Sequence, residues 1–189
     1  MKEHRTKSTK KLGSIISETV DWPVLAGACA VLLLVAAACG RQKITHLLLA
    51  MLVASVIAGV AANGIKSVAG RTRPSNKEVA QGWYGMQHEG EWIVTRNKFN
   101  SFPSSHTACA ASIFGMLWVL GRGPGVLSLV AVFLVMWARM AVGAHHFSDT
   151  VAAACIGFAV AWWTWRGPLP LAKWTERFIT WWRAKLGLR

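Results

Sequence analysis

Reactive side chains are concentrated in a stretch of sequence that is otherwise apolar. Asp149 is the only acidic residue between Glu91 and Glu176, His145 precedes it by four residues, and Arg139 precedes His145 by six. A lone carboxylate in apolar surroundings is costly unless it is partnered, and a spacing of four places two side chains on one helix face. We therefore expect Asp149 to accept a hydrogen bond from one ring nitrogen of His145, leaving the other free as a nucleophile. A purely structural His–Asp pair would give the same pattern.

A second group of polar residues is basic. Lys66, Arg71 and Arg73 lie within eight residues and are followed by Pro74. An arginine offers a planar fork that matches phosphate oxygens, and a lysine offers a point charge. A basic loop at a membrane edge would have the same composition, so this group alone leaves both interpretations open.

A third group stands where an apolar run begins. It is Pro103, Ser104, Ser105 and His106. Proline and serine at this place are typical of the start of a helix, and a helix N-terminus also binds anions because its free N–H groups point outward. We expect His106 to deliver a proton to a leaving oxygen, although a helix cap with an incidental interfacial histidine remains an alternative.

The composition indicates an integral membrane protein. The chain is 53% hydrophobic and only 15% charged, against about 25% charged residues in a typical soluble protein. Its formal net charge is +13, but the basic residues flank apolar runs and form no separate basic domain. We therefore expect a lipid bilayer and a phosphate-bearing substrate as partners, and no nucleic acid. The four cysteines lie in apolar segments without CxxC spacing, which argues against disulfides and zinc.

The apolar runs predict an all-α fold, a polytopic transmembrane helical bundle of about five spans with flanking interfacial helices. We expect the spans at residues 22–40, 44–65, 104–121, 126–142 and 150–166. We expect the first span to be retained rather than cleaved as a signal. Five alternating spans place the three polar groups on one membrane face, which is the condition for a single site. Gly59 and Gly64 are expected to allow close helix packing in the second span.

The chain is expected to form one domain, residues 1–189. We expect residues 1–20 to be a basic juxtamembrane tail or surface helix, and residues 168–189 a basic and aromatic interfacial tail. The polar loop 66–102 is expected to belong to the active site, because so long a connection is usually functional or disordered. Aromatic residues such as Trp83 and Tyr84 argue that this loop is folded or lies at the interface.

Together, the three groups resemble the signatures of the type 2 phosphatidic acid phosphatase (PAP2) superfamily, membrane phosphatases related to vanadium haloperoxidases. Lys-x6-Arg-Pro matches Lys66 to Pro74, Pro-Ser-Gly-His matches Pro103 to His106, and Ser-Arg-x5-His-x3-Asp matches Ala138 to Asp149. Two positions depart from these patterns. Ser105 replaces a glycine and is expected to crowd a backbone N–H at the phosphate, and Ala138 replaces a serine whose role is supporting.

The resemblance implies a role for each matched residue. His145 attacks phosphorus to form a phosphohistidine, Asp149 orients it and steadies its charge, and His106 protonates the leaving oxygen. The adjacent His146 is treated as secondary. The implied phosphate-binding residues are Lys66, Arg73, Ser104, Ser105 and Arg139. No metal or cofactor is implied, and the surrounding cations would repel a metal ion.

The resemblance therefore implies a metal-independent membrane phosphatase that hydrolyses a lipid phosphate monoester or diphosphate. Candidate substrates are phosphatidic acid, phosphatidylglycerophosphate, undecaprenyl diphosphate and lipid A phosphate. Two alternatives stay open: a lipid phosphotransferase that uses the same phosphohistidine, and a non-catalytic membrane protein whose basic rim binds anionic lipid. We expect a multi-pass protein of the bacterial inner membrane with its active site facing outward.

Overall fold

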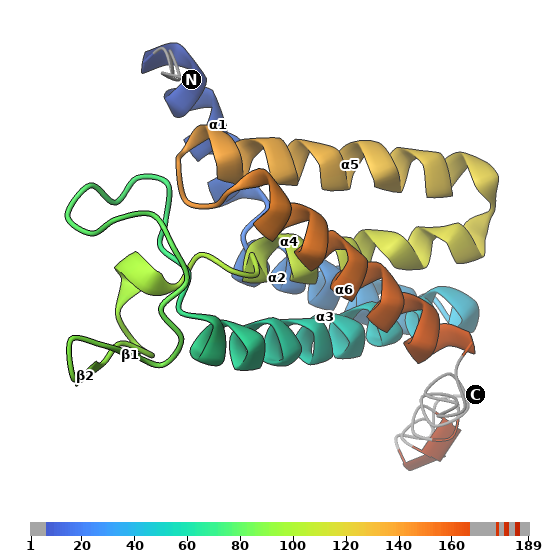
Figure 1. Cartoon of the computed structure of the whole chain (residues 1–189). Helices are drawn as coiled ribbons and strands as arrows, with labels where there is room; N and C mark the ends of the chain where they lie inside the picture. Colours follow the sequence, from blue (N-terminus) through green and yellow to red (C-terminus); the bar gives the residue numbers. More distant parts are fainter. Residues whose placement is uncertain (1–6, 167–176, 178–179, 182–183, 186–189) are drawn as a thin grey trace.

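The computed structural model describes residues 7–166, 177, 180–181 and 184–185 of the 189-residue chain. The interfacial tail expected at 168–189 lies almost entirely outside these residues. The elements are α1 (Lys7–Thr19), α2 (Trp22–Ala38), α3 (Gln42–Ala69), β1 (Gln87–His88), β2 (Glu91–Trp92), the 3-10 helix η1 (Asn97–Phe99), α4 (Ser105–Gly115), the 3-10 helix η2 (Met116–Leu120), α5 (Arg122–Ala141) and α6 (Phe147–Arg166) (Figure 1).

The predicted all-α transmembrane bundle is confirmed, but the five expected spans are not equivalent. Within the described residues, α3, α5 and α6 are each long and apolar enough to cross a membrane. The pair α1 and α2, bent by 40° between them, would count as a fourth span. The remaining apolar helix, Ser105–Leu120, is shorter. It packs against α3, α5 and α6, so its surroundings are largely protein, and it does not need the length of a lipid-facing span.

Small side chains let α4 lie close to its neighbours. Ala108, Ala110 and Ala111 of α4 are fully buried, as are Ala58 and Ala62 of α3. With almost no side-chain volume between them, the helix backbones approach closely, as they do in many membrane bundles. The short helix that begins at the third polar group is thereby held firmly at the centre of the bundle.

Two glycines expected to allow close packing behave differently. A Cβ on Gly59 would lie 3.1 Å from the Cys109 sulfur, so Gly59 does serve the contact between α3 and α4. Gly64 faces open space, because a Cβ at this position would have no neighbouring atom within 4 Å. The expectation for Gly64 is therefore wrong, since Gly64 lies on the exposed side of α3.

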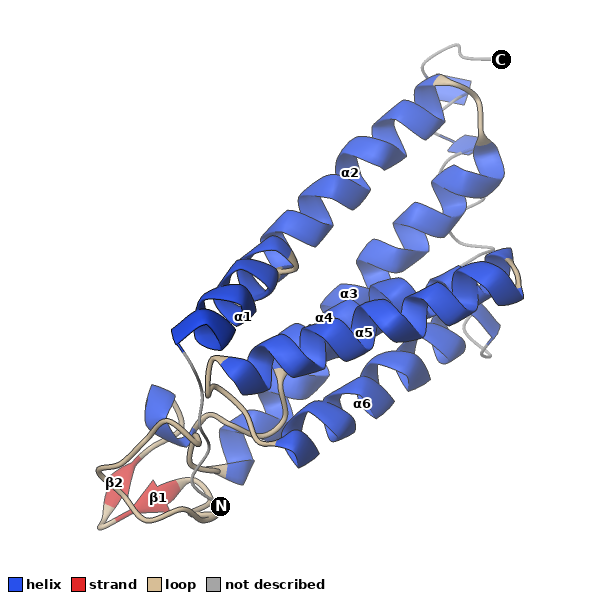
Figure 2. Ribbon diagram, turned by 90° about the horizontal axis from the view of Figure 1, so that it is seen from above, coloured by secondary structure: helices blue, strands red, loops and turns tan. Residues whose placement is uncertain are grey.

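The connection between α3 and α4 is folded, as the aromatic residues predict. Gly70 ends α3 in the left-handed conformation, φ 57°, which favours glycine. Beyond it lie the β1–β2 hairpin and η1 (Figure 2), where Ile93 and Phe99 are almost completely buried. Lys66 lies in the last turn of α3 and not in the loop itself.

The residues of the three polar groups lie at one end of the bundle. The end of α3, the start of α4, the end of α5 and the start of α6 gather on the side from which the folded loop projects (Figure 1). All three polar groups of the sequence are carried by these helix ends or by the segments next to them. The arrangement expected from alternating spans is therefore present, although only some of the described helices are long enough to span a membrane by length and composition.

Gly157 of α6 offers a test of this packing. A Cβ there would collide with the backbone oxygen of Ala108 and lie 2.6 Å from the Cβ of Ala111. Gly157→Ala is expected to destabilise the protein by about 1–3 kcal/mol, because overpacking forces the helices apart. The measurement is thermal unfolding of the purified protein in detergent. Gly64→Ala is the matched control, expected to be neutral or slightly stabilising, and an equal response of both variants would contradict the packing argument.

Candidate active site

The start of α4 forms one side of the candidate site. Ser104 is the N-cap, and its hydroxyl accepts hydrogen bonds from the backbone N–H and the hydroxyl of Thr107. Its own backbone N–H donates to the Asp149 carbonyl at 3.3 Å. This bond joins the start of α4 to the start of α6. The two helix N-termini therefore meet at the polar end of the bundle, where their dipoles favour negative charge.

Ser105 connects the start of α4 to α3. Lys66 Nζ donates to the Ser105 hydroxyl at 2.6 Å, and that hydroxyl donates to Asn63 Oδ1 at 2.7 Å. The serine that stands in place of the motif's glycine thus holds the first cation of the site. The other departure, Ala138, is fully buried. It lies where α1 crosses α5, and its carbonyl oxygen is 3.3 Å from the Cβ that Gly13 lacks.

Two guanidinium groups in the site have buried N–H groups without a partner. Within the described residues, Arg73 Nε and Arg139 Nε are both buried and make no hydrogen bond. Burial also lowers the pKa of Arg73. An unsatisfied buried donor costs about 1–3 kcal/mol, and more when it is charged. Two such donors beside Lys66 form a strongly positive pocket that an anion would satisfy, and guanidinium groups match phosphate oxygens best.

His145 is buried and held by a backbone atom. Its Nδ1 lies 2.6 Å from the Ser101 carbonyl oxygen, and because a carbonyl can only accept, Nδ1 must carry the proton. Nε2 is therefore the nitrogen with a free lone pair. Burial, and after it the charge of Arg139, lowers the pKa of His145 to about 2. A neutral imidazole with a free Nε2 is what a nucleophile requires.

The expected direct hydrogen bond between His145 and Asp149 is not formed. Nδ1 and the nearer carboxylate oxygen are 4.0 Å apart, too far for a hydrogen bond. The helical-spacing argument fails because α6 begins only at Phe147, so His145 lies in the preceding turn. Ser101 links the two residues instead: its carbonyl accepts from His145 and its hydroxyl donates to Asp149.

The partner of Asp149 is Arg71. The two form an ion pair in which the carboxylate is buried and the guanidinium partly buried. The Arg71 guanidinium also donates to the Ser148 hydroxyl at 2.7 Å and lies over the Trp83 ring. The backbone N–H of His146 adds a further hydrogen bond to the carboxylate. The sequence motifs place Arg71 in the basic group and give it no separate role. The signal that could have found it is that the only carboxylate of the region needs a cation.

The N-terminal segment contributes two contacts that the sequence does not reveal. His106 Nε2 lies 2.8 Å from Asp21 Oδ1, and Arg139 donates to the Ser17 hydroxyl at 2.5 Å. The sequence predicts residues 1–20 only as a tail or surface helix. The amphipathic pattern predicts the helix but not the residues that it contacts. The pairs Asp21–His106 and Ser17–Arg139 are separated by 85 and 122 residues in the sequence.

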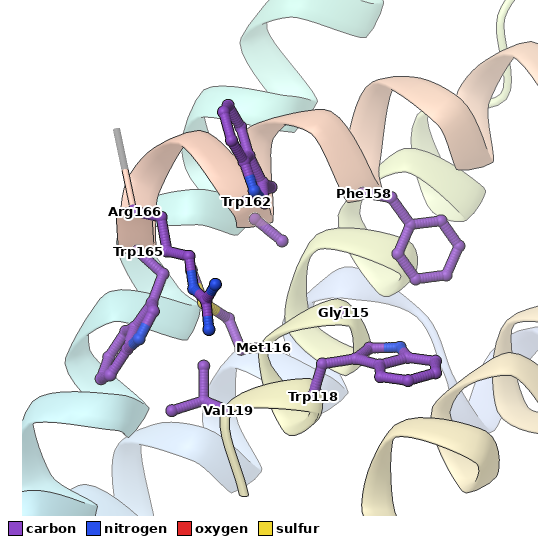
Figure 3. A pocket seen from close by; sticks show the side chains of 9 residues that line it. Gly115, Met116, Trp118, Val119, Phe158, Trp162, Trp165 and Arg166 are labelled. Carbon is purple, nitrogen blue, oxygen red and sulfur yellow. The ribbon is translucent and has the colours of Figure 1, made fainter. Parts of the chain in front are cut away.

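A cavity of about 330 Å³ lies beside His106. It is lined by Asp21, Trp22, Ser55, Val56, Gly59, Val60, Asn63, Ser105, His106 and Cys109. A separate cavity of about 380 Å³ lies at the opposite end of the bundle, between η2 and α6, with Trp118, Phe158 and Trp165 around it (Figure 3). It shares no residue with the candidate site. Of these two cavities, the first is the one that adjoins His106 and Ser105.

Comparison with known protein families assigns this architecture. The sequence model of the PAP2 family, described as the PAP2 superfamily, matches residues 43–171, well over half of the chain. The chain belongs to the PAP2 superfamily. The matched residues contain all three polar groups, whereas α1 and α2, with Ser17 and Asp21, precede them.

Two individual similarities refine this assignment. Lipid phosphate phosphatase 1 of Arabidopsis thaliana is 30% identical over an alignment of 139 residues, and the match covers 61% of this chain and 42% of that protein. The match thus spans less than half the length of this relative. The crystal structure of Aquifex aeolicus LpxE is similar with a TM-score of 0.58 and 18% identity, over 85% of this chain and 87% of that one. At this identity the likeness concerns the fold.

Binding of inorganic phosphate tests the anion pocket. Phosphate is expected to raise the melting temperature of the wild type, because a ligand that binds only the folded state stabilises it. Arg73→Gln and Arg139→Gln should largely lose this shift. Arg96→Gln is the matched control, since Arg96 pairs with Glu91 on the exposed loop. A full phosphate shift in Arg73→Gln would argue against the pocket.

The depressed pKa of His145 predicts a dependence of stability on pH. Between its ordinary value near 6.5 and its folded value of about 2, the unfolded chain binds a proton that the folded chain does not. The free energy of unfolding should therefore fall as the pH drops below about 6.5. His145→Gln removes this contribution, so the variant should lose less stability than the wild type between pH 7.5 and pH 5. Chemical unfolding at the two pH values measures it, and parallel losses would contradict the argument.

Proposed function

We propose that this PAP2 protein hydrolyses a lipid phosphate monoester or diphosphate through a phosphohistidine intermediate. The observation that carries the proposal is the pair of buried, unsatisfied guanidinium N–H groups next to a neutral histidine whose Nε2 is free. Within the described residues, Lys66, Arg73 and Arg139 form no ion pair with a carboxylate, so their charges are available to a bound phosphate. The free imidazole nitrogen of His145 can then attack the phosphorus. The similarity to a protein named a lipid phosphate phosphatase supports the same chemistry.

In the proposed first step, Lys66, Arg73 and Arg139 hold the non-bridging oxygens, with the N-terminus of α4 at Ser104 and Ser105 beside them. Nε2 of His145 attacks phosphorus and the bond to the leaving oxygen breaks. The leaving oxygen takes a proton from His106. The Ser101 carbonyl keeps the proton of His145 on Nδ1 throughout, and the nearby Asp149 steadies the charge that the ring acquires.

The second step returns the enzyme to its starting state. A water molecule attacks the phosphohistidine and gives a proton to His106, which has just lost one. The P–N bond breaks, inorganic phosphate leaves, and His145 regains its lone pair. One ester bond and one water are consumed, and one alcohol and one phosphate are formed. For a lipid diphosphate, the leaving group is the lipid monophosphate in place of the alcohol.

A lipid is proposed as substrate because of where the site lies. The reactive groups stand at one end of three apolar helices, and the adjoining cavity contains the apolar side chains of Trp22, Val56 and Val60. Phosphatidic acid, phosphatidylglycerophosphate, undecaprenyl diphosphate and lipid A phosphate all combine a phosphate with apolar chains. A soluble phosphate ester has no apolar chain that could pack against these side chains.

We also propose that the protein resides in a bacterial inner membrane with the site on the outer face. The support is the basic turn at the opposite end of the bundle, where Arg41 and Lys43 join α2 to α3 and Arg122 begins α5. Basic residues in short loops favour the cytoplasmic side. The basic N-terminal helix lies at the site end, packed against α5.

Phosphate release from a panel of purified lipid phosphates tests the function. The wild type is expected to release phosphate from at least one, and His145→Ala to lose roughly 10³-fold or more, as expected when a covalent nucleophile is removed. Acid quenching should trap a phosphoprotein in the wild type and none in His145→Ala. His46→Ala is the matched control, because His46 lies near the opposite end of α3.

Further outcomes separate the rival functions. Vanadate should inhibit, and a chelator of divalent metals should not. Transfer of the phosphate to an added lipid, in place of water, would identify a phosphotransferase. Phosphate release that needs a divalent metal and survives His145→Ala would overturn the mechanism, and no release from any lipid would favour a non-catalytic lipid-binding protein.

A further inference from the structure

The bend between α1 and α2 lies against the active site. Helix α1 packs along α5, the helix that carries Arg139, and α2 packs along α3. At the bend, Ser17 accepts a hydrogen bond from Arg139 and Asp21 contacts His106. Both residues precede the part of the chain that matches the PAP2 family. The signature motifs therefore assign them no role.

The contact between Asp21 and His106 is close and specific. Asp21 Oδ1 lies 2.8 Å from His106 Nε2, and the same oxygen accepts from the backbone N–H of Trp22 at 2.8 Å. The second contact makes Asp21 the N-cap of α2. Capping alone does not require a histidine within hydrogen-bond distance. Both side chains are partly exposed, 32% for His106 and 42% for Asp21, and both line the cavity beside the site.

The surroundings of His106 are otherwise positive. The charged groups that act on it from the neighbouring elements are Lys66 of α3, Arg73 of the loop, Arg139 of α5 and Asp21 at the α1–α2 bend. Asp21 is the one negative group among them. Three cations disfavour an imidazolium, so a histidine that must hold and deliver a proton here needs a carboxylate beside it.

We propose that Asp21 is a positioning residue for departure of the leaving group, a role that rests on the proposed phosphatase function. Asp21 accepts the Nε2–H of His106 and balances the charge of its imidazolium. The Nδ1–H then supplies the proton. When the P–O bond breaks, this proton moves to the leaving oxygen and His106 remains neutral, still donating from Nε2 to Asp21.

Asp21→Asn separates this role from capping. Asparagine caps a helix as well as aspartate does and retains an acceptor for Nε2–H, but it carries no charge. Asp21→Ser is a second variant that keeps the cap and shortens the side chain away from His106. Glu18→Gln is the matched control, because it removes the same charge about one turn earlier. Glu18 is exposed there, and its carboxylate accepts only from the Ser14 hydroxyl among the described hydrogen bonds.

The experiment compares two substrates through kcat/KM, which reports the first step alone when that step is irreversible. Dioctanoyl phosphatidic acid has an alkoxide leaving group, which needs a proton to depart. The second substrate, 4-nitrophenyl phosphate, releases 4-nitrophenolate, which departs without a proton. General acid catalysis contributes about 10²–10⁴-fold, so Asp21→Asn should lower kcat/KM for the lipid at least roughly 10-fold and for 4-nitrophenyl phosphate less than about 3-fold. Glu18→Gln should stay within about twofold for both, as surface charges contribute little.

Each outcome decides the matter. An equal loss for both substrates in Asp21→Asn and Asp21→Ser would mean that Asp21 only supports the fold, and no loss would mean that it is only a helix cap; either result overturns the proposal. A wild type that is active with unaffected Asp21 variants leaves the phosphatase function standing. A wild type that releases phosphate from neither substrate overturns the proposed function, and the role of Asp21 with it.

Discussion

The buried charge of Asp149 is the constraint on which the polar end of the protein depends. A carboxylate removed from water must be paired and hydrogen-bonded, and here its partners come from separate parts of the chain. Arg71 arrives from the segment after α3, and the Ser101 hydroxyl from the segment before α4. Satisfying one carboxylate therefore fixes the folded loop and the entries of two helices at once, and with them the ring of His145.

The arginines of the site follow the opposite principle. Arg71 has a carboxylate partner, whereas Arg73 and Arg139 keep buried N–H groups that nothing in the described protein satisfies. A fold can tolerate such a cost when a ligand removes it. The distinction separates one arginine that is paired within the protein from two that we propose bind an anion. Composition cannot distinguish the paired arginine from the two unpaired ones, because each of the three only adds one positive charge to the net charge.

Much of this is predictable from the sequence, and the failures have physical causes. Apolar runs predict the helices, and alternation brings Lys66 and His145 to one end. The partner of Asp149 is missed because the spacing rule assumes a helix that in fact starts two residues after His145. The roles of Ser17 and Asp21 depend on contacts across the whole chain, which no local period records. The count of five spans is approximate, because among the described helices Ser105–Leu120 is apolar but shorter than α3, α5 and α6.

The proton on His145 is held by a main-chain oxygen, that of Ser101, whereas the proton on His106 is held by a side chain. A single substitution can delete a carboxylate but not a peptide carbonyl. The tautomer of His145, the proposed nucleophile, is thus robust to point mutation, whereas the surroundings of His106, the proposed acid, can be changed by one substitution. Single substitutions near His106, the proposed acid, could therefore adapt the protein to lipids whose leaving groups are easier or harder to expel. No single substitution could change the tautomer of His145 in the same way.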